Sequence, residues 1–176
     1  MTNNIRTRTT YKSTDIMRKP AGPPQPPEVG EGKRGEEGYL GYLLRQASAA
    51  HRLRMERALS PLDATAPQFL VLTMLGAYPG LSNADIARLT MLTPQTVSVI
   101  VANLTRVGAV TRRAHAVHGR IQELGLSETG QTLLARCREA VRDAEQYLSE
   151  GVSEADERVI RRWLVAVAVE PGTDGG

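Results

Sequence analysis

Apolar residues recur every three or four positions along most of the chain, which predicts a protein built mainly from amphipathic helices. The first such stretch covers residues 38–59, where leucines and alanines are interleaved with arginines. Similar spacing predicts further helices over residues 66–75, 83–89, 94–107 and 128–150, and a last helix after Ser153. We therefore expect a mainly α-helical fold.

Polar residues at the helix starts support these boundaries. A side chain that accepts a hydrogen bond from the third residue of a helix caps it, and a glutamine or an acidic residue at that third position completes a capping box. Thr65 with Gln68, and Ser82 with Asp85, have this spacing. The predicted caps are Thr65, Ser82, Thr93, which stands directly before a proline, Ser127 and Ser153.

The middle of the chain has the pattern of a winged helix-turn-helix. Only a few residues separate the helices predicted over 83–89 and 94–107, and Gly108 suits the left-handed position after the second of them. The strand-like runs 110–113 and 121–126 flank a tip that contains a glycine, which predicts a β-hairpin, or wing. The predicted fold class is mainly α with a small β-wing, flanked by N-terminal and C-terminal helices.

The first 37 residues differ in composition from the rest. Residues 20–37 are rich in proline, glycine and glutamate and bury too little apolar surface to offset chain entropy, so we expect residues 1–37 to be a disordered arm. Its first part holds five basic residues and one acidic residue, a net charge of +4. A solvated tail, a misplaced start before an initiator at Met17, and an arm that contacts DNA all remain open. The ordered domain is predicted over residues 38–170, and residues 171–176 as a frayed tail.

Composition is that of one soluble globular domain. The chain has 176 residues, of which 41% are hydrophobic and 23% charged. No stretch reaches the roughly eighteen apolar residues of a membrane span, and the start lacks the apolar core of a secretion signal, so we expect a cytoplasmic protein without a membrane partner. A single cysteine, Cys137, excludes an internal disulfide and is expected to be inert core. Without a phosphate loop, a nucleophile elbow or metal-ligand spacing, we expect no enzyme, cofactor or metal.

Positive charge is concentrated in the predicted winged helix-turn-helix. Residues 81–126 contain five arginines and two acidic residues, an excess of +3 that equals the net charge of the whole chain. Arginines that neutralise phosphates supply much of the affinity of a protein for DNA. The sequence therefore predicts double-stranded DNA as the partner of this region.

The segments Thr93–Arg113 (TPQTVSVIVANLTRVGAVTRR) and His118–Gly130 (HGRIQELGLSETG) resemble the recognition helix, wing and following helix of the MarR family of winged-helix transcriptional regulators. The resemblance extends over residues 39–169. It implies a homodimer, held by the first and the last two helices, that binds palindromic operator DNA as a repressor and leaves it when a small molecule binds. The alternative is a dimeric winged-helix adaptor that does not read DNA sequence.

Two groups of residues are predicted to contact DNA. The helix that begins after Thr93 would enter the major groove with its first turns, and the wing would reach the backbone or the minor groove. By the resemblance, Arg120 is the wing arginine and His118 stands where the family often has an acidic residue, while Val99 and Asn103 stand where many relatives have arginine. The predicted contacts are Ser82, Thr93, Gln95, Thr96, Ser98, Val99, Asn103, Arg106, Arg112, Arg113, His118 and Arg120.

Apolar stripes on the last two helices indicate a partner surface, because a small monomer would not readily expose them. A second copy of the chain is the simplest partner, and packing within one chain is the alternative. With the resemblance, residues 62–126 are assigned to DNA binding, and residues 38–59 and 127–169 to dimerisation. The predicted dimerisation residues are Leu133, Leu134, Val141, Leu148, Val159, Ile160, Trp163 and Leu164.

The resemblance also implies a small-molecule effector. We expect an aromatic or amphipathic molecule beside the first helix, near His51, Met55, Phe69 and Met74, where apolar walls would be combined with a polar group. The alternative is that these four residues belong only to the core.

Overall fold

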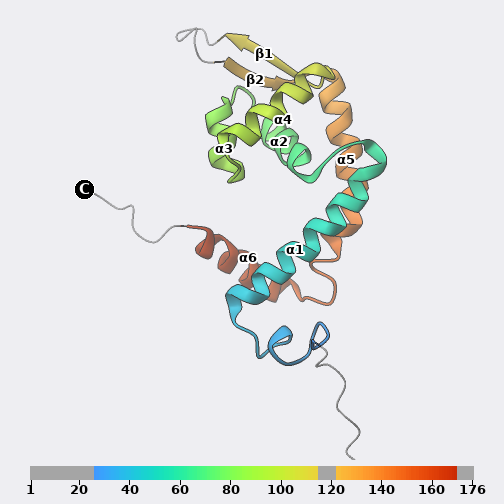
Figure 1. The fold of residues 1–176 in the computed structure, drawn as a ribbon, viewed down its shortest axis with the longest axis vertical. Coiled ribbons are helices and arrows are strands. Elements are labelled where there is room, and N and C mark those ends of the chain that lie inside the picture. The colour runs from blue at the N-terminus through green and yellow to red at the C-terminus, as the bar shows by residue number, and fades with distance from the viewer. Residues whose placement is uncertain (1–25, 115–121, 170–176) are drawn as a thin grey trace, which may run out of the picture. The chain divides into compact units, whose positions relative to one another are not determined.

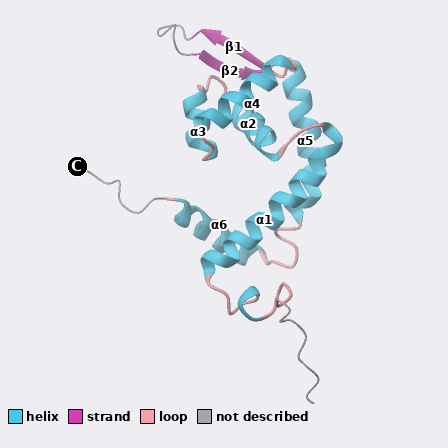
Figure 2. Ribbon diagram, in the orientation of Figure 1, coloured by secondary structure: helices cyan, strands magenta, loops and turns pink. Residues whose placement is uncertain are grey.

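A computed structural model describes residues 26–114 and 122–169 (Figure 1). Helices make up most of the described chain, and the two strands form one antiparallel hairpin (Figure 2). The elements are η1 (Gly32–Arg34), α1 (Leu40–Leu59), η2 (Ser60–Leu62), α2 (Ala66–Ala77), α3 (Asn83–Thr90), α4 (Pro94–Arg106), β1 (Val110–Ala114), β2 (Gln122–Leu126), α5 (Glu128–Gln146) and α6 (Glu154–Ala168). The predicted fold class is therefore confirmed.

The chain divides after Leu43 into two compact units. In the described part of the first unit, the backbone turns at Gly30 and Gly32, whose φ angles of +98° and +48° favour glycine. The Arg34 guanidinium donates a hydrogen bond to the Pro27 carbonyl (2.8 Å), which closes the turn around η1.

This turn corrects one prediction. Residues 26–37 were expected to belong to a disordered arm, but local backbone hydrogen bonds and the Arg34 contact give them a short 3-10 helix. The rest of the predicted arm, residues 1–25, and the predicted frayed tail, residues 171–176, lie outside the described residues.

Polar caps begin the helices of the second unit at the predicted positions. Thr65 and Ser82 each form a complete capping box, with Gln68 and Asp85 respectively. The hydroxyls of the other three predicted caps accept a hydrogen bond from the backbone N–H of the third residue of the helix, which satisfies a donor that the helix itself leaves unpaired. These caps are Thr93, Ser127 and Ser153.

Several predicted boundaries shift by one to four residues. Helix α2 continues past Gly76 to Ala77, and α5 ends at Gln146 instead of near residue 150 because the chain enters a turn that leads to Gly151, with φ +75°. Strand β1 gains Ala114 and pairs with β2 from Val110 opposite Leu126.

The larger of two apolar clusters holds the winged helix-turn-helix together. Residues from α2, α3, α4, both strands and α5 bury their side chains in it, so α4, which is the expected recognition helix, and the hairpin, which is the expected wing, rest on one core. Its buried members are Val71, Leu72, Leu75, Ile86, Ala87, Val97, Ile100, Val101, Leu104, Ala109, Val110, Leu124 and Leu134.

The second cluster joins α1 to α5. It contains Met55, Leu59, Ala64, Cys137, Val141 and Ala144, and Phe69 and Leu133 pack against both clusters. Burial raises the pKa of the Cys137 thiol, which favours its unreactive protonated form.

The two clusters correct the prediction that Leu134 and Val141 contribute to dimerisation. Leu134 is 4% exposed and Val141 3% exposed, so both belong to the core of the single chain and neither forms a surface for a partner. Leu133 is also partly buried between the two clusters. The apolar stripe of α5 therefore packs within the single chain over most of its length. This is the alternative to a partner surface that the sequence also allowed.

Candidate nucleic-acid interface

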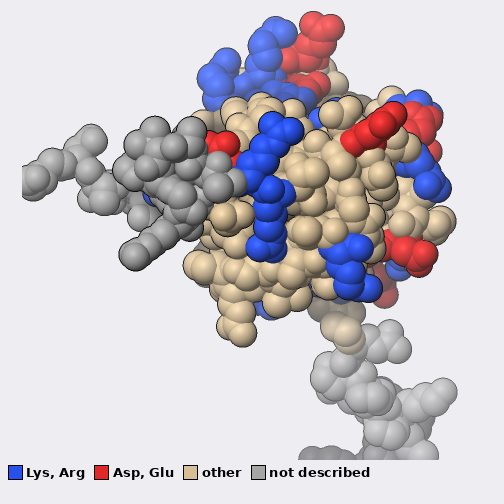
Figure 3. All heavy atoms as spheres, turned by 90° about the horizontal axis from the view of Figure 1, so that it is seen from above, with Lys and Arg blue, Asp and Glu red and all other residues tan. Residues whose placement is uncertain are grey.

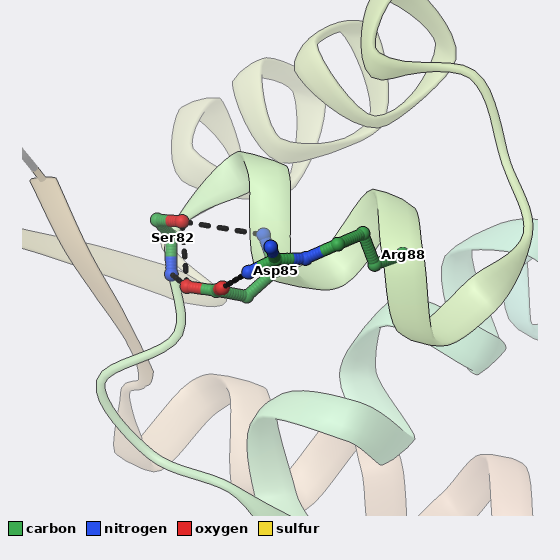
Figure 4. A network of polar contacts seen from close by, with 3 residues as sticks. All are labelled: Ser82, Asp85 and Arg88. Atoms are coloured by element: carbon green, nitrogen blue, oxygen red, sulfur yellow. Dashed lines mark hydrogen bonds and ion pairs between the residues drawn. The ribbon is translucent and has the colours of Figure 1, made fainter. Parts of the chain in front are cut away.

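Three polar side chains form a network at the start of α3 (Figure 4). The Ser82 hydroxyl accepts a hydrogen bond from Asp85 N (3.2 Å), and Asp85 Oδ2 accepts from Ser82 N (3.0 Å) and from the Ser82 hydroxyl (2.6 Å). Arg88, one turn further on, donates to the other carboxylate oxygen. Hydrogen bonds from Ser82, and then from Arg88, lower the pKa of Asp85. Ser82, a predicted DNA contact, thus already uses its hydroxyl in the helix cap.

A tight turn of Met91, Leu92 and Thr93 joins α3 to α4. Met91 has a left-handed backbone (φ +55°) and its side chain is exposed, whereas Leu92 packs against the larger cluster. The Thr90 hydroxyl is buried and donates to the Ile86 carbonyl (2.7 Å), so the last turn of α3 keeps its polar group satisfied. These features define a helix-turn-helix.

Helix α4 has one buried face and one exposed face. Val97, Ile100, Val101 and Leu104 are buried, which fixes the rotation of the helix about its axis. The opposite face exposes a set of polar and small apolar side chains that could reach base edges, and four of them were predicted contacts: Gln95, Thr96, Ser98 and Val99. The hydroxyls of Thr93 and Thr96 lie 2.8 Å apart at the helix start and are both exposed.

The two arginines of β1 project to opposite faces of the hairpin. Neighbouring residues in a strand alternate, and the register places Arg112 opposite Leu124 and Arg113 opposite Glu123. Leu124 is buried, so Arg112 shares the face that packs on the core, and Arg113 lies on the other face. Arg112 and Arg113, both predicted to contact DNA, therefore lie on opposite faces of the hairpin.

The remaining wing residues of the prediction, His118 and Arg120, lie outside the described residues. Figure 3 views the protein from the end that carries the hairpin, and basic side chains lie there in several separate groups on a largely uncharged face, with acidic side chains toward its edges.

Two cavities flank the winged helix-turn-helix. We call the first the wing cavity; it has a volume of about 620 Å³ and lies between the end of α2, the hairpin and α5. Its lining comprises Leu75, Gly76, Pro79, Gly80, Thr111, Arg113, Glu123, Leu124, Gly125, Leu126, Gln131, Leu134, Ala135 and Arg138.

The second, which we call the recognition-helix cavity, has a volume of about 700 Å³ and lies between η2, α2, the end of α4 and the start of α5. Asn103 and Arg106, both predicted DNA contacts, line it together with Arg136 of α5. Asn103 is half-buried, so it is less available to DNA than the first turns of α4.

The four predicted effector residues line neither cavity. Met55 and Phe69 meet in the second apolar cluster, and Met74 is half-buried on α2. His51 faces α5, where its Nε2 lies 3.4 Å from Glu145 Oε1, and its Nδ1 is buried without a hydrogen bond. The structure does not bring these four side chains to a common pocket in the single chain.

An apolar face remains open at the end of α5 and along α6. None of the residues of α6, all of which the structure describes, is buried. The five other predicted dimerisation residues are between 38% and 53% exposed: Leu148, Val159, Ile160, Trp163 and Leu164. Next to them, the Arg54 guanidinium stacks over the Tyr147 ring at 4.0 Å and ties α1 to the end of α5.

Arg138 and Gly76 line the wing cavity but are not among the residues predicted from the sequence. Arg138 follows Leu134 by four residues and so lies on the same side of α5, a spacing that could have identified it. Gly76 looked like the end of α2, and only the packed structure reveals that Leu134 and Leu126 surround it.

The capped helix-turn-helix with its hairpin places the protein in the class of winged helix-turn-helix proteins. A model of the MarR family matches residues 62–121. The chain is 36% identical over 122 residues to the HTH-type transcriptional repressor Rv2887 of Mycobacterium tuberculosis, a match that covers 69% of this chain and 88% of that protein. The protein belongs to the MarR family and is a DNA-binding transcriptional regulator.

Solved structures agree with this assignment. The M. tuberculosis MarR family protein Rv2887 in complex with salicylic acid superposes with a TM-score of 0.60 at 35% identity, over 75% of this chain and 98% of the other. Its complex with DNA gives a TM-score of 0.60 at 32% identity, over 74% and 98%. In the described part of the chain, no helix combines the length and the apolar character that a membrane crossing requires.

Proposed function

We propose that the protein is a homodimeric repressor that binds palindromic operator DNA in the cytoplasm and is released by a small aromatic carboxylate. We assign it no enzymatic activity. The observation that carries the proposal is the geometry of α4, whose buried face is locked in the core while Gln95, Ser98 and Val99 stand exposed on the other face of the helix. Such a helix can read base edges in a major groove.

The side chains of α4 and of the hairpin suit different parts of the DNA. Gln95 can make paired hydrogen bonds to adenine, and Val99 can contact the methyl group of thymine. Arg112 carries a charge suited to phosphate, which adds affinity without sequence information. We therefore assign base reading to α4 and backbone binding to the hairpin.

The exposed apolar face of Leu148 and α6 supports a twofold dimer. Five large apolar side chains that are each more than a third exposed leave a patch of the kind that marks protein interfaces. In a twofold dimer the patch of one protomer packs against the same patch of its partner. The two recognition helices would then meet half-sites about 10 base pairs apart.

Release by an aromatic carboxylate is supported by relatives. Rv2887, a repressor at 36% identity, has been solved in complex with salicylic acid and with DNA. A ligand releases an operator only if it binds the DNA-free conformation more tightly than the DNA-bound one.

Titration of the full-length protein with duplexes selected from a random pool, at several salt concentrations, tests the function. We expect tight binding to selected duplexes, weaker binding to random duplexes, and a steep fall of both affinities with salt. Equal affinity for selected and random duplexes, or binding that is absent at low salt, would instead favour a winged-helix adaptor. Sodium salicylate should release the selected duplex and leave the duplex intact.

A further inference from the structure

We infer that the wing cavity is the site where this protein binds an aromatic carboxylate, with Arg138 of α5 and Arg113 of the wing as the groups that hold the carboxylate. The inference rests on the proposed function and names its effector site. It differs from the site expected from sequence, beside His51 and Met55, because those residues do not line the cavity.

The cavity combines an apolar floor with two arginines. Its lining includes the core residues Leu75 and Leu134 and the partly buried Leu126, which we call the floor, and an aromatic ring can lie against this apolar part. Neither Arg113 nor Arg138 forms an ion pair or a side-chain hydrogen bond with any residue that the structure describes. Among the lining residues that the structure describes, two arginines and one acidic residue, Glu123, leave an excess of one positive charge, which favours an anion.

Arginine suits a carboxylate better than other cations do. Its planar guanidinium donates two parallel hydrogen bonds to the two carboxylate oxygens, and such charge-assisted pairs are among the stronger polar interactions. The Gln131 amide, also in the lining, offers a donor and an acceptor for a ring substituent such as a hydroxyl.

Gly76 keeps the floor open beside Arg138. A Cβ atom at this position would lie 2.8 Å from Leu134 Cδ2, 3.5 Å from Leu126 Cδ1 and 3.8 Å from Arg138 Nη2. A side chain there would therefore occupy the space between the apolar floor and the guanidinium. The glycine is exposed and lies in the last turn of α2, and a larger residue there must displace the tip of the buried Leu134 side chain.

Occupation of the cavity affects DNA binding through the hairpin. Arg113 belongs to β1, whereas Arg138 belongs to α5, so one carboxylate bound by both would fix the hairpin against α5. Arg113 is also a predicted DNA contact, and a guanidinium paired with the ligand is withdrawn from phosphate. Both effects lower the affinity for the operator when the ligand is present, and by linkage the operator lowers the affinity for the ligand.

The matched control lies on the same helix. Arg136 is two residues before Arg138, is exposed as Arg138 is, and lines the recognition-helix cavity instead. We would measure sodium salicylate binding to the full-length protein by calorimetry, and operator release by fluorescence anisotropy, for the parent protein, Arg138→Ala, Arg136→Ala and Gly76→Leu. We expect Arg138→Ala to weaken salicylate binding by about tenfold or more because it removes a charge-assisted pair. Arg136→Ala should stay within about twofold of the parent.

Gly76→Leu distinguishes the contribution of the arginine charges from that of the free volume of the cavity. It keeps both arginines but fills the cavity, so it should abolish salicylate binding and release while operator affinity without ligand stays at the parent value. That unchanged operator affinity also shows that the variant is folded.

Several results would overturn the site. Salicylate binding that is lost in Arg136→Ala but kept in Arg138→Ala would place the site in the recognition-helix cavity. A further variant, His51→Ala, would place the site beside the first helix if it alone lost salicylate binding. If Arg138→Ala instead made the salt dependence of DNA binding shallower by about one unit, Arg138 would be a phosphate contact and the cavity part of the DNA interface. If the parent protein binds operator but no salicylate, the proposed salicylate site is wrong and the proposed DNA recognition is unaffected. If it binds no duplex at all, the proposed function itself is wrong.

Discussion

Gly130, in the first turn of α5, lies directly against the backbone carbonyl of Ala109, and a Cβ atom at position 130 would overlap the carbonyl oxygen. The same oxygen accepts a hydrogen bond from Ser127 N (3.1 Å), and Ser127 Oγ accepts one from Gly130 N (3.0 Å). The end of the recognition helix, the start of the wing and the start of α5 are thus joined at one contact between backbones, which tolerates no side chain.

Gly130→Ala should therefore destabilise the protein strongly. The new methyl group meets backbone rather than a flexible side chain, so α5 must move away from Ala109, and we expect a loss of about 3 kcal/mol or more in the free energy of unfolding measured with urea. Gly41→Ala is the control, because it has open space around its Cβ position in α1 and should change stability by less than about 1 kcal/mol. Equal stability of the Gly130→Ala and parent proteins would disprove the contact.

The network at the start of α3 predicts a pH dependence. Because its hydrogen bonds lower the pKa of Asp85 in the folded protein, the ionised carboxylate stabilises the fold above the ordinary pKa of aspartate, and this contribution is lost as the pH falls through the folded pKa. Asp85→Asn should thus lower stability at pH 7, and its difference from the parent should shrink in strongly acidic solution.

Ser82→Ala provides a second measurement on the same network. Loss of the cap should cost about 1 kcal/mol at pH 7, and the double variant with Asp85→Asn should cost less than the sum of the single variants because they share hydrogen bonds. A strictly additive result, or a difference for Asp85→Asn that does not change with pH, would contradict the network.

Short-range sequence patterns were sufficient to predict the helices and their first residues. Thr65 with Gln68 and Ser82 with Asp85 cap their helices as predicted, because a cap depends only on residues within one turn. The sequence could not assign the partner of an apolar stripe: Leu134 and Leu148 lie on the same stripe, yet the first is core and the second is exposed. Nor could it separate Arg112 from Arg113, whose faces follow from the register of the hairpin. The cavities arise from contacts between distant elements and have no local signature.

The helix and the wing should respond differently when changed. Gln95→Ala should weaken operator binding by roughly 1 to 3 kcal/mol and random DNA little, because a base contact carries sequence information. Arg112→Ala should weaken both and reduce the salt dependence by about one unit for each phosphate that is no longer neutralised. Anisotropy titrations against both duplexes at several salt concentrations would separate the two, and equal losses on both duplexes for Gln95→Ala would show that α4 does not read bases.

The exposed face of α6 should hold two copies of the chain together. Trp163 and Leu164 are 38% and 42% exposed in the single chain, and burial of such side chains contributes about 1.5 to 3 kcal/mol each when it is complete. Replacing both by alanine should therefore raise the dimer dissociation constant by about a hundredfold or more, measured by sedimentation over a range of concentrations. The control is Arg158→Ala on the same helix. Arg158 is exposed and pairs with Glu154 one turn away, so its loss should leave the dissociation constant nearly unchanged.

Because DNA binding at two half-sites depends on the dimer, the double variant should also lose tight operator binding while each chain keeps its affinity for random DNA. A parent protein that sediments as a folded monomer at micromolar concentration would show that α6 serves another partner.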